Sequence, residues 1–590
     1  MSSYEYGIMK HTGQRRKRRW TVFLRKSRQK GGRVYLAIVE GYRRDGKVKQ
    51  RTVESLGYLD ELEKRFDDPV AHFKAVCDER NAAAKAERQA VPIEIHPMER
   101  IDRRARGRKN IGSAALLSIY SSLGLERTVR NNARGSKATF DLNAVLRLLV
   151  CERILNPGSK AAAWGNRDGY FFRSEFEEQH VYRALSMLEP MRDKIVSAIN
   201  RSIDKQGVRD MTSVFYDVTN YYFECDPDDF RRKGVCKEHK PNPIVQMGLL
   251  QDKNAVPIGY KLFSGNTNDC STMMDVLADM KRDYKLDRVI VVADKGLNTS
   301  NNIAACVGRG DGFVYSQSIR GAKSTKELRN WVLADEGYRE QGDGFKIKSR
   351  QDTKMITVVG ADGKERKVPV ETKTVAFWSR KYAERARHER AAAVERAREL
   401  ARDPGAYSAA THFGAAKYVD GLKVDKDTGE VLEGATALTF NEAKLAADEA
   451  CDGYYCLVTS EYELPDEDIV DIYRGLWRIE ESFKVTKSDL EARPVYCSTR
   501  EHIEAHFLTC YVALCILRLL QLRTGNKYSA AVIADELGKM CGTNVDGNWW
   551  CFDHRSDASD EICASAGIDL SRKFMQLKDI KKVLAQANGR

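Results

Sequence analysis

The chain has 590 residues, more than one hydrophobic core normally serves, so several domains are expected. Apolar residues make up 42% and charged residues 31%, which is typical of a folded, water-soluble protein and excludes disorder along the whole chain. The net charge of +14 and the basic run from Arg15 to Arg19 favour a polyanionic partner only modestly, since a solvated basic tail has the same composition.

The 14 cysteines are scattered without a regular framework, which is typical of buried thiols in a reducing cytosol. Two short spacings, Cys236 with His239 and Cys451 with Cys456, lack the second ligand pair of a structural zinc site. The sequence shows no apolar run that would span a bilayer and no signal peptide, so a cytoplasmic protein without membrane contact is expected.

The first two regions differ in their hydrophobic period. Residues 1–100 form a basic module in which alternation over 34–39, a turn at Asp45 and Gly46 and a second run over 48–57 predict a β-hairpin. Residues 101–210 switch to a helical period, for example at Leu142, Val145 and Leu146. We interpret this region as a helical, DNA-binding domain, although no recognition helix is evident from the sequence.

Residues 211–320 predict an α/β region. Apolar runs end at Asp217 and at Asp294, and a helix is expected near residues 271–284. Because both aspartates follow predicted strands, we expect their side chains to meet at one end of a sheet.

Residues 321–452 have the character of a mostly β insertion, with strand-like segments such as 355–359 and a turn over 425–429. A charged helix over 381–402 includes Arg385. A solvated face explains these charges better than DNA contact does.

Residues 453–523 return to the earlier α/β style. A strand is predicted over 454–459, and a helix that begins at Pro465 and ends before Pro494 carries Glu480. A second, strongly apolar helix covers about 500–522. The tail region 524–590 shows no recognisable chemistry.

Asp217, Asp294 and Glu480 are a suitable set of ligands for two divalent cations. In-line cleavage of a phosphodiester needs an activated nucleophile and a neutralised leaving oxygen, and two metal ions supply both. Mg²⁺ prefers oxygen ligands and keeps several waters, so a few carboxylates from separate elements are sufficient.

The helix that carries Glu480 adds supporting residues. Tyr473, Glu480 and Lys487 are seven residues apart and would project along nearly one line, with Trp477 one turn before Glu480. An exposed Glu480 paired with Lys484, and aromatic residues at the edge of the core, explain the spacing about equally well.

Two histidines four residues apart suggest a different metal site. His502 and His506 would share one face of the apolar helix. A metalloprotease motif needs Glu directly after the first histidine, where this chain has Ile503, so surface or core-edge histidines are the better interpretation.

Three blocks of sequence resemble the bacterial insertion-sequence transposases of the IS4 superfamily, most closely the IS1634-like branch. Other segments support the resemblance, including the end of the N-terminal hairpin at 56–59. The blocks are Tyr216-Asp217-Val218-Thr219, Val292-Ala293-Asp294-Lys295-Gly296 and the segment from Tyr473 to Glu480, extended by Phe483, Lys487 and Arg493-Pro494-Val495-Tyr496.

The resemblance implies a multidomain α/β protein with an RNase H-like catalytic core. That core would be interrupted by the mostly β insertion and preceded by the hairpin module and the helical domain. It also implies that Asp217, Asp294 and Glu480 bind the metal ions and act in catalysis, while Tyr473, Trp477 and Lys487 contact DNA. The arginine of the superfamily's helix motif is replaced here by Leu476.

The implied activity is metal-dependent DNA cleavage at element ends and strand transfer into target DNA. Two Mg²⁺ ions, replaceable by Mn²⁺, would serve as cofactors. The implied partners are terminal inverted repeats and target DNA, with a homodimer on paired ends in the bacterial cytoplasm at the nucleoid. Two other classes stay open: a non-catalytic DNA-binding regulator derived from a transposase, and a metal-dependent nuclease on the same fold.

Overall fold

The chain forms two compact units, residues 1–100 and 101–590. The computed structural model describes residues 21–29, 31–44, 47–88, 98, 100, 107–136, 138–234, 242–267, 272–273, 276–279, 282, 288–321, 324–342, 344–359, 364–402, 415, 417–420 and 439–589. Several sequence features therefore lie outside the described residues: the basic run 15–19, the turns at 45–46 and 425–429, Cys236, His239 and much of the helix expected over 271–284.

The N-terminal unit is a three-stranded antiparallel sheet beside a long helix. Its elements are β1 (Val22–Arg28), β2 (Val34–Arg44), β3 (Lys47–Tyr58), α1 (Leu59–Leu62) and α2 (Pro69–Arg88). Strands β2 and β3 pair as the predicted hairpin, and β1 adds to β2 without having been foreseen. Asn81 of α2 ties the helix to β1, because its amide bonds to both backbone groups of Val22 at 2.8 and 2.7 Å.

The helical period predicted for the next region is confirmed. The helices are α3 (Ser113–Ser122), α4 (Leu125–Ala133), α5 (Leu142–Leu155), α6 (Lys160–Asn166), α7 (Glu178–Leu188) and α8 (Arg192–Lys205). Their buried faces share one hydrophobic core with α17 (Arg500–Arg523), which packs against α5 and α7. The helices therefore form one body with the sheet region rather than a detached module.

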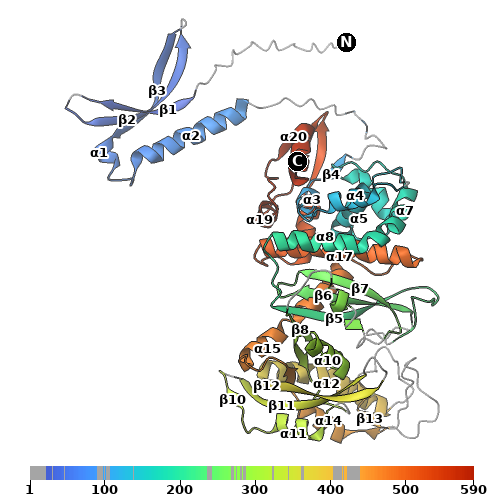
Figure 1. Ribbon diagram of the computed structural model, residues 1–590. Coiled ribbons are helices and arrows are strands. Elements are labelled where there is room, and N and C mark those ends of the chain that lie inside the picture. Colours follow the sequence, from blue (N-terminus) through green and yellow to red (C-terminus); the bar gives the residue numbers. More distant parts are fainter. Residues whose placement is uncertain are drawn as a thin grey trace, which may run out of the picture. The chain divides into compact units, whose positions relative to one another are not determined.

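A nine-stranded sheet lies at the centre of this second unit (Figure 1). Its order is β10-β11-β12-β15-β9-β8-β5-β6-β7. Strand β6 pairs antiparallel with β5, and β7 pairs antiparallel with β6. On the other side, β8 pairs parallel with β5, and β9 pairs parallel with β8. The bounds are β5 (Ser213–Tyr222), β6 (Ile244–Asp252), β7 (Pro257–Ser264), β8 (Ile290–Ala293), β9 (Gly312–Ser316), β10 (Arg339–Glu340), β11 (Phe345–Val359), β12 (Glu365–Ser379) and β15 (Tyr454–Thr459).

Side chains alternate between the two faces of this sheet, as the strand period requires. Phe215 and Val292 belong to the core formed with α17 and the helical region. Tyr216 and Ala293 belong to a second core on the other face, where α10 (Ser300–Gly308) contributes Ile303. The segment from Pro465 places α15 (Asp466–Arg474) and α16 (Trp477–Lys484) on the first face.

The region predicted as an insertion contributes both strands and helices. Residues 355–359 lie in β11, and the charged helix predicted from 381 begins at Arg380. Strands β10, β11 and β12 extend the central sheet beyond β15. The other elements are α11 (Lys326–Leu333), α12 (Arg380–Arg402), β13 (Val419–Asp420), β14 (Thr439–Phe440) and α14 (Glu442–Glu449).

The C-terminal region is tied to the start of the second unit. Strand β16 (Cys541–Asp546) pairs with β4 (Arg108–Asn110), and α20 (Leu577–Ala587) packs against α3. The remaining elements here are α18 (Ala530–Lys539), β17 (Trp549–Phe552), α19 (Asp557–Ser565) and β18 (Phe574–Gln576). No local sequence pattern predicts the sheet to which β4 and β16 belong.

Helix α17 is long and apolar enough to cross a membrane. Its most apolar 18-residue window is completely buried within the protein, against the sheet and the surrounding helices. The helix is therefore a core element of this fold.

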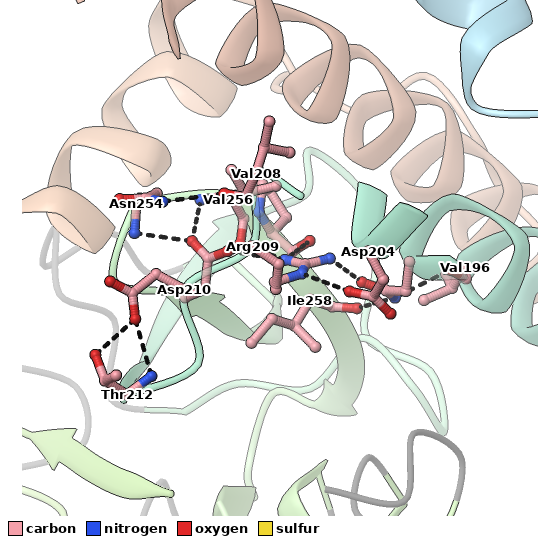
Figure 2. Close-up of polar contacts among 12 residues, drawn as sticks. Val196, Asp204, Val208, Arg209, Asp210, Thr212, Asn254, Val256 and Ile258 are labelled. Atoms are coloured by element: carbon pink, nitrogen blue, oxygen red, sulfur yellow. Dashed lines mark hydrogen bonds and ion pairs between the residues drawn. The ribbon is translucent and has the colours of Figure 1, made fainter. Parts of the chain in front are cut away.

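A buried polar network joins α8 to the turn between β6 and β7 (Figure 2). Arg209 contacts Asp252 at 3.3 Å, donates to the carbonyl oxygens of Val256 and Pro257 at 3.2 Å, and bonds to Asn200. The carboxylate of Asp252 also accepts the backbone N–H groups of Asn254 and Val256, both at 2.9 Å. The network satisfies polar groups where the helical region meets the sheet.

Asp252 should make the stability of the fold depend on pH. Burial raises the pKa of Asp252 to about 6 even though Arg209 opposes the shift. The folded protein therefore holds this proton more tightly than the unfolded chain, so the stabilisation is complete below about pH 4 and is lost as the pH rises through about 6. The Asp252→Asn variant lacks this titration but keeps an oxygen acceptor. As the pH rises from about 4 through about 6, the free energy of unfolding of the wild type should fall by about 3 kcal/mol relative to that of the variant.

Denaturant unfolding of both proteins between pH 4 and pH 7 measures this difference. Asp210 is a matched control, because hydrogen bonds from Thr212 outweigh burial and lower the pKa of Asp210. Asp210→Asn should therefore leave the pH profile parallel to that of the wild type between pH 4 and pH 7, because Asp210 titrates below this range. Parallel profiles for wild type and Asp252→Asn would show that Asp252 does not titrate in this range.

Candidate active site beside β5 and β8

Asp217 and Asp294 lie at adjoining positions on neighbouring parallel strands. The last residues that β5 and β8 pair with each other are Phe215 and Val292, and each aspartate follows one of these two residues by two positions. Residues two apart on a strand share a face, so both aspartates lie on the face that packs against α15 and α16. Both are half-buried. The strand register therefore brings the two aspartates together, but the prediction that both follow their strands is wrong for Asp217, because β5 continues to Tyr222.

Two hydroxyl groups orient the Asp294 carboxylate. Ser316, at the end of β9, donates to Oδ1 of Asp294 at 2.7 Å, and the phenol of Tyr473 donates to the same oxygen at 3.3 Å. Burial, and then the neighbouring charge of Asp294, raise the pKa of Tyr473, so its phenol stays a donor at neutral pH. The sequence pattern indicated Tyr473 as a site residue, whereas no signal in the sequence indicated Ser316.

Glu480 is exposed on α16, whose opposite face is anchored in the core. Leu476, Ile479 and Phe483 are buried. Helix α16 packs against β5, so the element that carries Glu480 contacts the strand that carries Asp217.

The helix over 466–489 is interrupted, in contrast to the single helix predicted. Helix α15 ends at Arg474 and α16 begins at Trp477, and the next turn, over Val485–Asp489, is π-helical. Between them, backbone bonds join residues three apart, from Leu476 to Tyr473 and from Ile479 to Leu476. The tighter turn between α15 and α16 and the wider π-helical turn after α16 change the angle by which successive side chains are rotated about the helix axis. Tyr473, Glu480 and Lys487 therefore do not follow one continuous helical line.

Lys487 and Trp477 differ in exposure. The ammonium group of Lys487 lies 5.6 Å from the centre of the Tyr221 ring, next to the far end of β5. Trp477 is 56% exposed, and the guanidinium of Arg478 lies 5.6 Å from its ring centre. An exposed indole next to a carboxylate-bearing helix face can stack on a planar group brought by a ligand.

Arg385 of α12 lies near the candidate site. The sequence predicted only that this arginine belongs to a solvated helix face. The pKa of Arg385 is raised, first by its 2.7 Å hydrogen bond to Glu389 and, among smaller effects, by the charge of Glu480. The first turns of α12 therefore lie near the exposed carboxylate of α16. A charge run alone could not reveal this proximity, because it depends on how residues 321–452 fold back.

The donor chemistry of this region fits hard divalent cations, since it offers carboxylate oxygens on adjoining elements. Among the described residues, no three Asp, Glu, His or Cys side chains are grouped closely enough to hold a metal ion. Three carboxylates at ligand distance without a cation would repel one another. The convergence of Glu480 with the two aspartates stays a prediction.

Of the histidine and cysteine pairs weighed in the sequence, the two that lie among the described residues are core or core-edge groups. His506 is buried and bonds to Lys160 at 2.8 Å and to the Ala492 carbonyl at 3.0 Å, whereas His502 contacts Ser186 at 3.1 Å. Cys451 and Cys456 are buried in one small hydrophobic cluster.

Two family models match the chain. Residues 24–91 match the N-terminal domain of IS1634 family transposases, and residues 225–516 match the transposase DDE domain. Together the matches span more than half of the chain. No curated protein matches it. The DDE match includes Asp294 and Glu480 and begins after Asp217, so the place of Asp217 in the site rests on its register beside Asp294.

Strands β6 to β12 and β15, with α15, α16 and most of α17, thus lie in the segment that matches the transposase DDE domain, a class that implies an RNase H-like fold, action on DNA and the general use of divalent metals. With its N-terminal unit matched as well, the chain belongs to the IS1634-like insertion-sequence transposases.

Proposed function

We propose that this transposase cleaves DNA at the ends of its own element and joins the freed 3′-hydroxyl to target DNA. The observation that supports this most directly is the adjoining placement of Asp217 and Asp294, on the sheet face against which the helices carrying Tyr473 and Glu480 pack. Asp217, Asp294 and Glu480 would hold two Mg²⁺ ions, for which Mn²⁺ can substitute.

The bound ions would activate the attacking hydroxyl and neutralise the leaving oxygen. The protein's own groups prepare this chemistry. Ser316 and Tyr473 fix one oxygen of Asp294, which leaves its other oxygen to face a ligand. The cation of Lys487 would contact a phosphate, and Trp477 would stack on a base displaced from the duplex.

The mostly β insertion is proposed to shape the entrance to this site. Arg385 lies near enough to Glu480 to be affected by its charge, so α12 brings a cation toward the exposed carboxylate of α16. A homodimer would hold the two ends of the element together while both are processed.

The decisive experiment incubates the full chain with labelled duplexes that carry the inverted repeats flanking its gene, together with unlabelled plasmid. With Mg²⁺ or Mn²⁺ we expect a nick at the repeat boundary and transfer of the label to the plasmid, and neither product with chelator or with scrambled ends. Cleavage without transfer would indicate a nuclease. Binding without cleavage would indicate a regulator, and either result contradicts the proposal.

A further inference from the structure

The helical region contains a basic hollow away from the residues of the proposed active site. It has a volume of about 660 Å³ and lies between α4 and α8, which pack against each other. Its cationic lining residues are Arg127, Lys194, Arg201, Lys205 and Arg282. Asp193 is the one acid in the lining, and it already bonds to the neighbouring Arg192 at 3.0 Å.

The sequence of α8 explains why these cations share one side. Ile195, Ile199 and Ile203 are buried in the core, so the opposite face of the helix projects outward. Lys194, Arg201 and Lys205 are exposed on that outward side. Burial of the isoleucines therefore fixes the direction in which the cations point.

The spacing of these cations suits a long polyanion. Eleven residues separate Lys194 from Lys205, which corresponds to about 16 Å along a helix. One strand of duplex DNA presents about five phosphates over that length. A small anion would occupy only part of such an open stripe.

We infer that the α4–α8 hollow binds the phosphate backbone of duplex DNA, independently of base sequence. The inference deepens the proposed function, on which it rests for the identity of the polyanion. Flexible, exposed Lys and Arg side chains contact phosphates without distinguishing bases. The hollow would hold DNA in place while the sheet-end carboxylates act on it.

The test compares the full-length protein with the double variant Arg201→Gln, Lys205→Gln. Binding to two duplexes of equal length and unrelated sequence is measured by fluorescence anisotropy over a range of salt concentrations, with chelator present. Loss of two phosphate contacts should reduce the salt slope by about 1.8 and weaken binding about 30-fold at 0.15 M salt, equally for both sequences. Chelator separates this binding from cleavage.

Lys578→Gln with Lys581→Gln on α20 is the matched control, because both lysines are exposed and the same charge is removed. The charge-preserving pair Arg201→Lys, Lys205→Arg should bind as the wild type does, and thermal unfolding shows that each variant is folded. An equal loss in the control, a loss on one duplex only, or an unchanged affinity would overturn the inference while leaving the proposed function intact. Failure of the wild type to bind either duplex would also overturn the inference, whereas the proposed function is tested separately by cleavage of the element's own ends.

Discussion

Replacing Asp217 or Asp294 with asparagine, or Glu480 with glutamine, is expected to slow DNA cleavage about a thousandfold or more. Each amide keeps the size of the side chain but removes the charge that holds a cation, and metal ions contribute several kcal/mol to stabilising the transition state. Binding to the same labelled ends in chelator should be unchanged, because the exposed cations that would contact phosphates are untouched. Single-turnover cleavage and anisotropy measure the two effects separately.

A matched control comes from the same helical segment. Asp468 of α15 is exposed, and Asp468→Asn removes one carboxylate a few residues from Tyr473 without altering the sheet end. This variant should cleave at the wild-type rate. If one amide variant also cleaves normally, that residue is not a metal ligand, and normal cleavage by all three would remove the proposed site.

The sequence predicted those parts of the site that have a local signature. Each aspartate follows a run of apolar residues, and parallel pairing of β5 and β8 brings the two together, although Asp217 lies inside β5 rather than at its end. The sequence placed Tyr473 in the site, where its phenol bonds to Asp294, and its contact with DNA stays a prediction. Ser316 could not be singled out, because a serine that ends a strand is common and its role depends on β9 lying next to β8.

For the fold as well, local sequence patterns predicted single elements but not the pairing of segments that lie far apart in the chain. The β2–β3 hairpin, strand β15 and helix α17 have strong periodicity, and each occurs where predicted. The pairing of β4 with β16 joins residues more than four hundred positions apart. No turn or periodic signal connects such segments, so only the assembled core determines their pairing.

Gly475→Ala is expected to destabilise the fold and to slow cleavage more than it weakens DNA binding. A Cβ atom at Gly475 would lie 2.5 Å from Cζ of Phe215, a β5 side chain that is 1% exposed and cannot move aside. Alanine normally stabilises a helical position relative to glycine. Here the clash should reverse that preference and cost about 1–3 kcal/mol.

The same clash should affect catalysis, because Phe215 lies two residues before Asp217 and Gly475 lies five residues before Glu480. Moving α16 away from β5 by about 1 Å would separate the proposed ligands and is expected to slow cleavage roughly a hundredfold. Denaturant unfolding and single-turnover cleavage of the same preparations measure both effects.

Two further variants decide whether the close approach of helix and strand is the cause. Phe215→Leu removes the obstructing ring atoms, so its combination with Gly475→Ala should be more stable than the sum of the two single effects predicts. Gly538 of α18 has open space around its missing Cβ, and Gly538→Ala should be neutral or slightly stabilising. If Gly475→Ala behaves like Gly538→Ala, then α16 does not approach β5 closely enough for Glu480 to share a cation with Asp217.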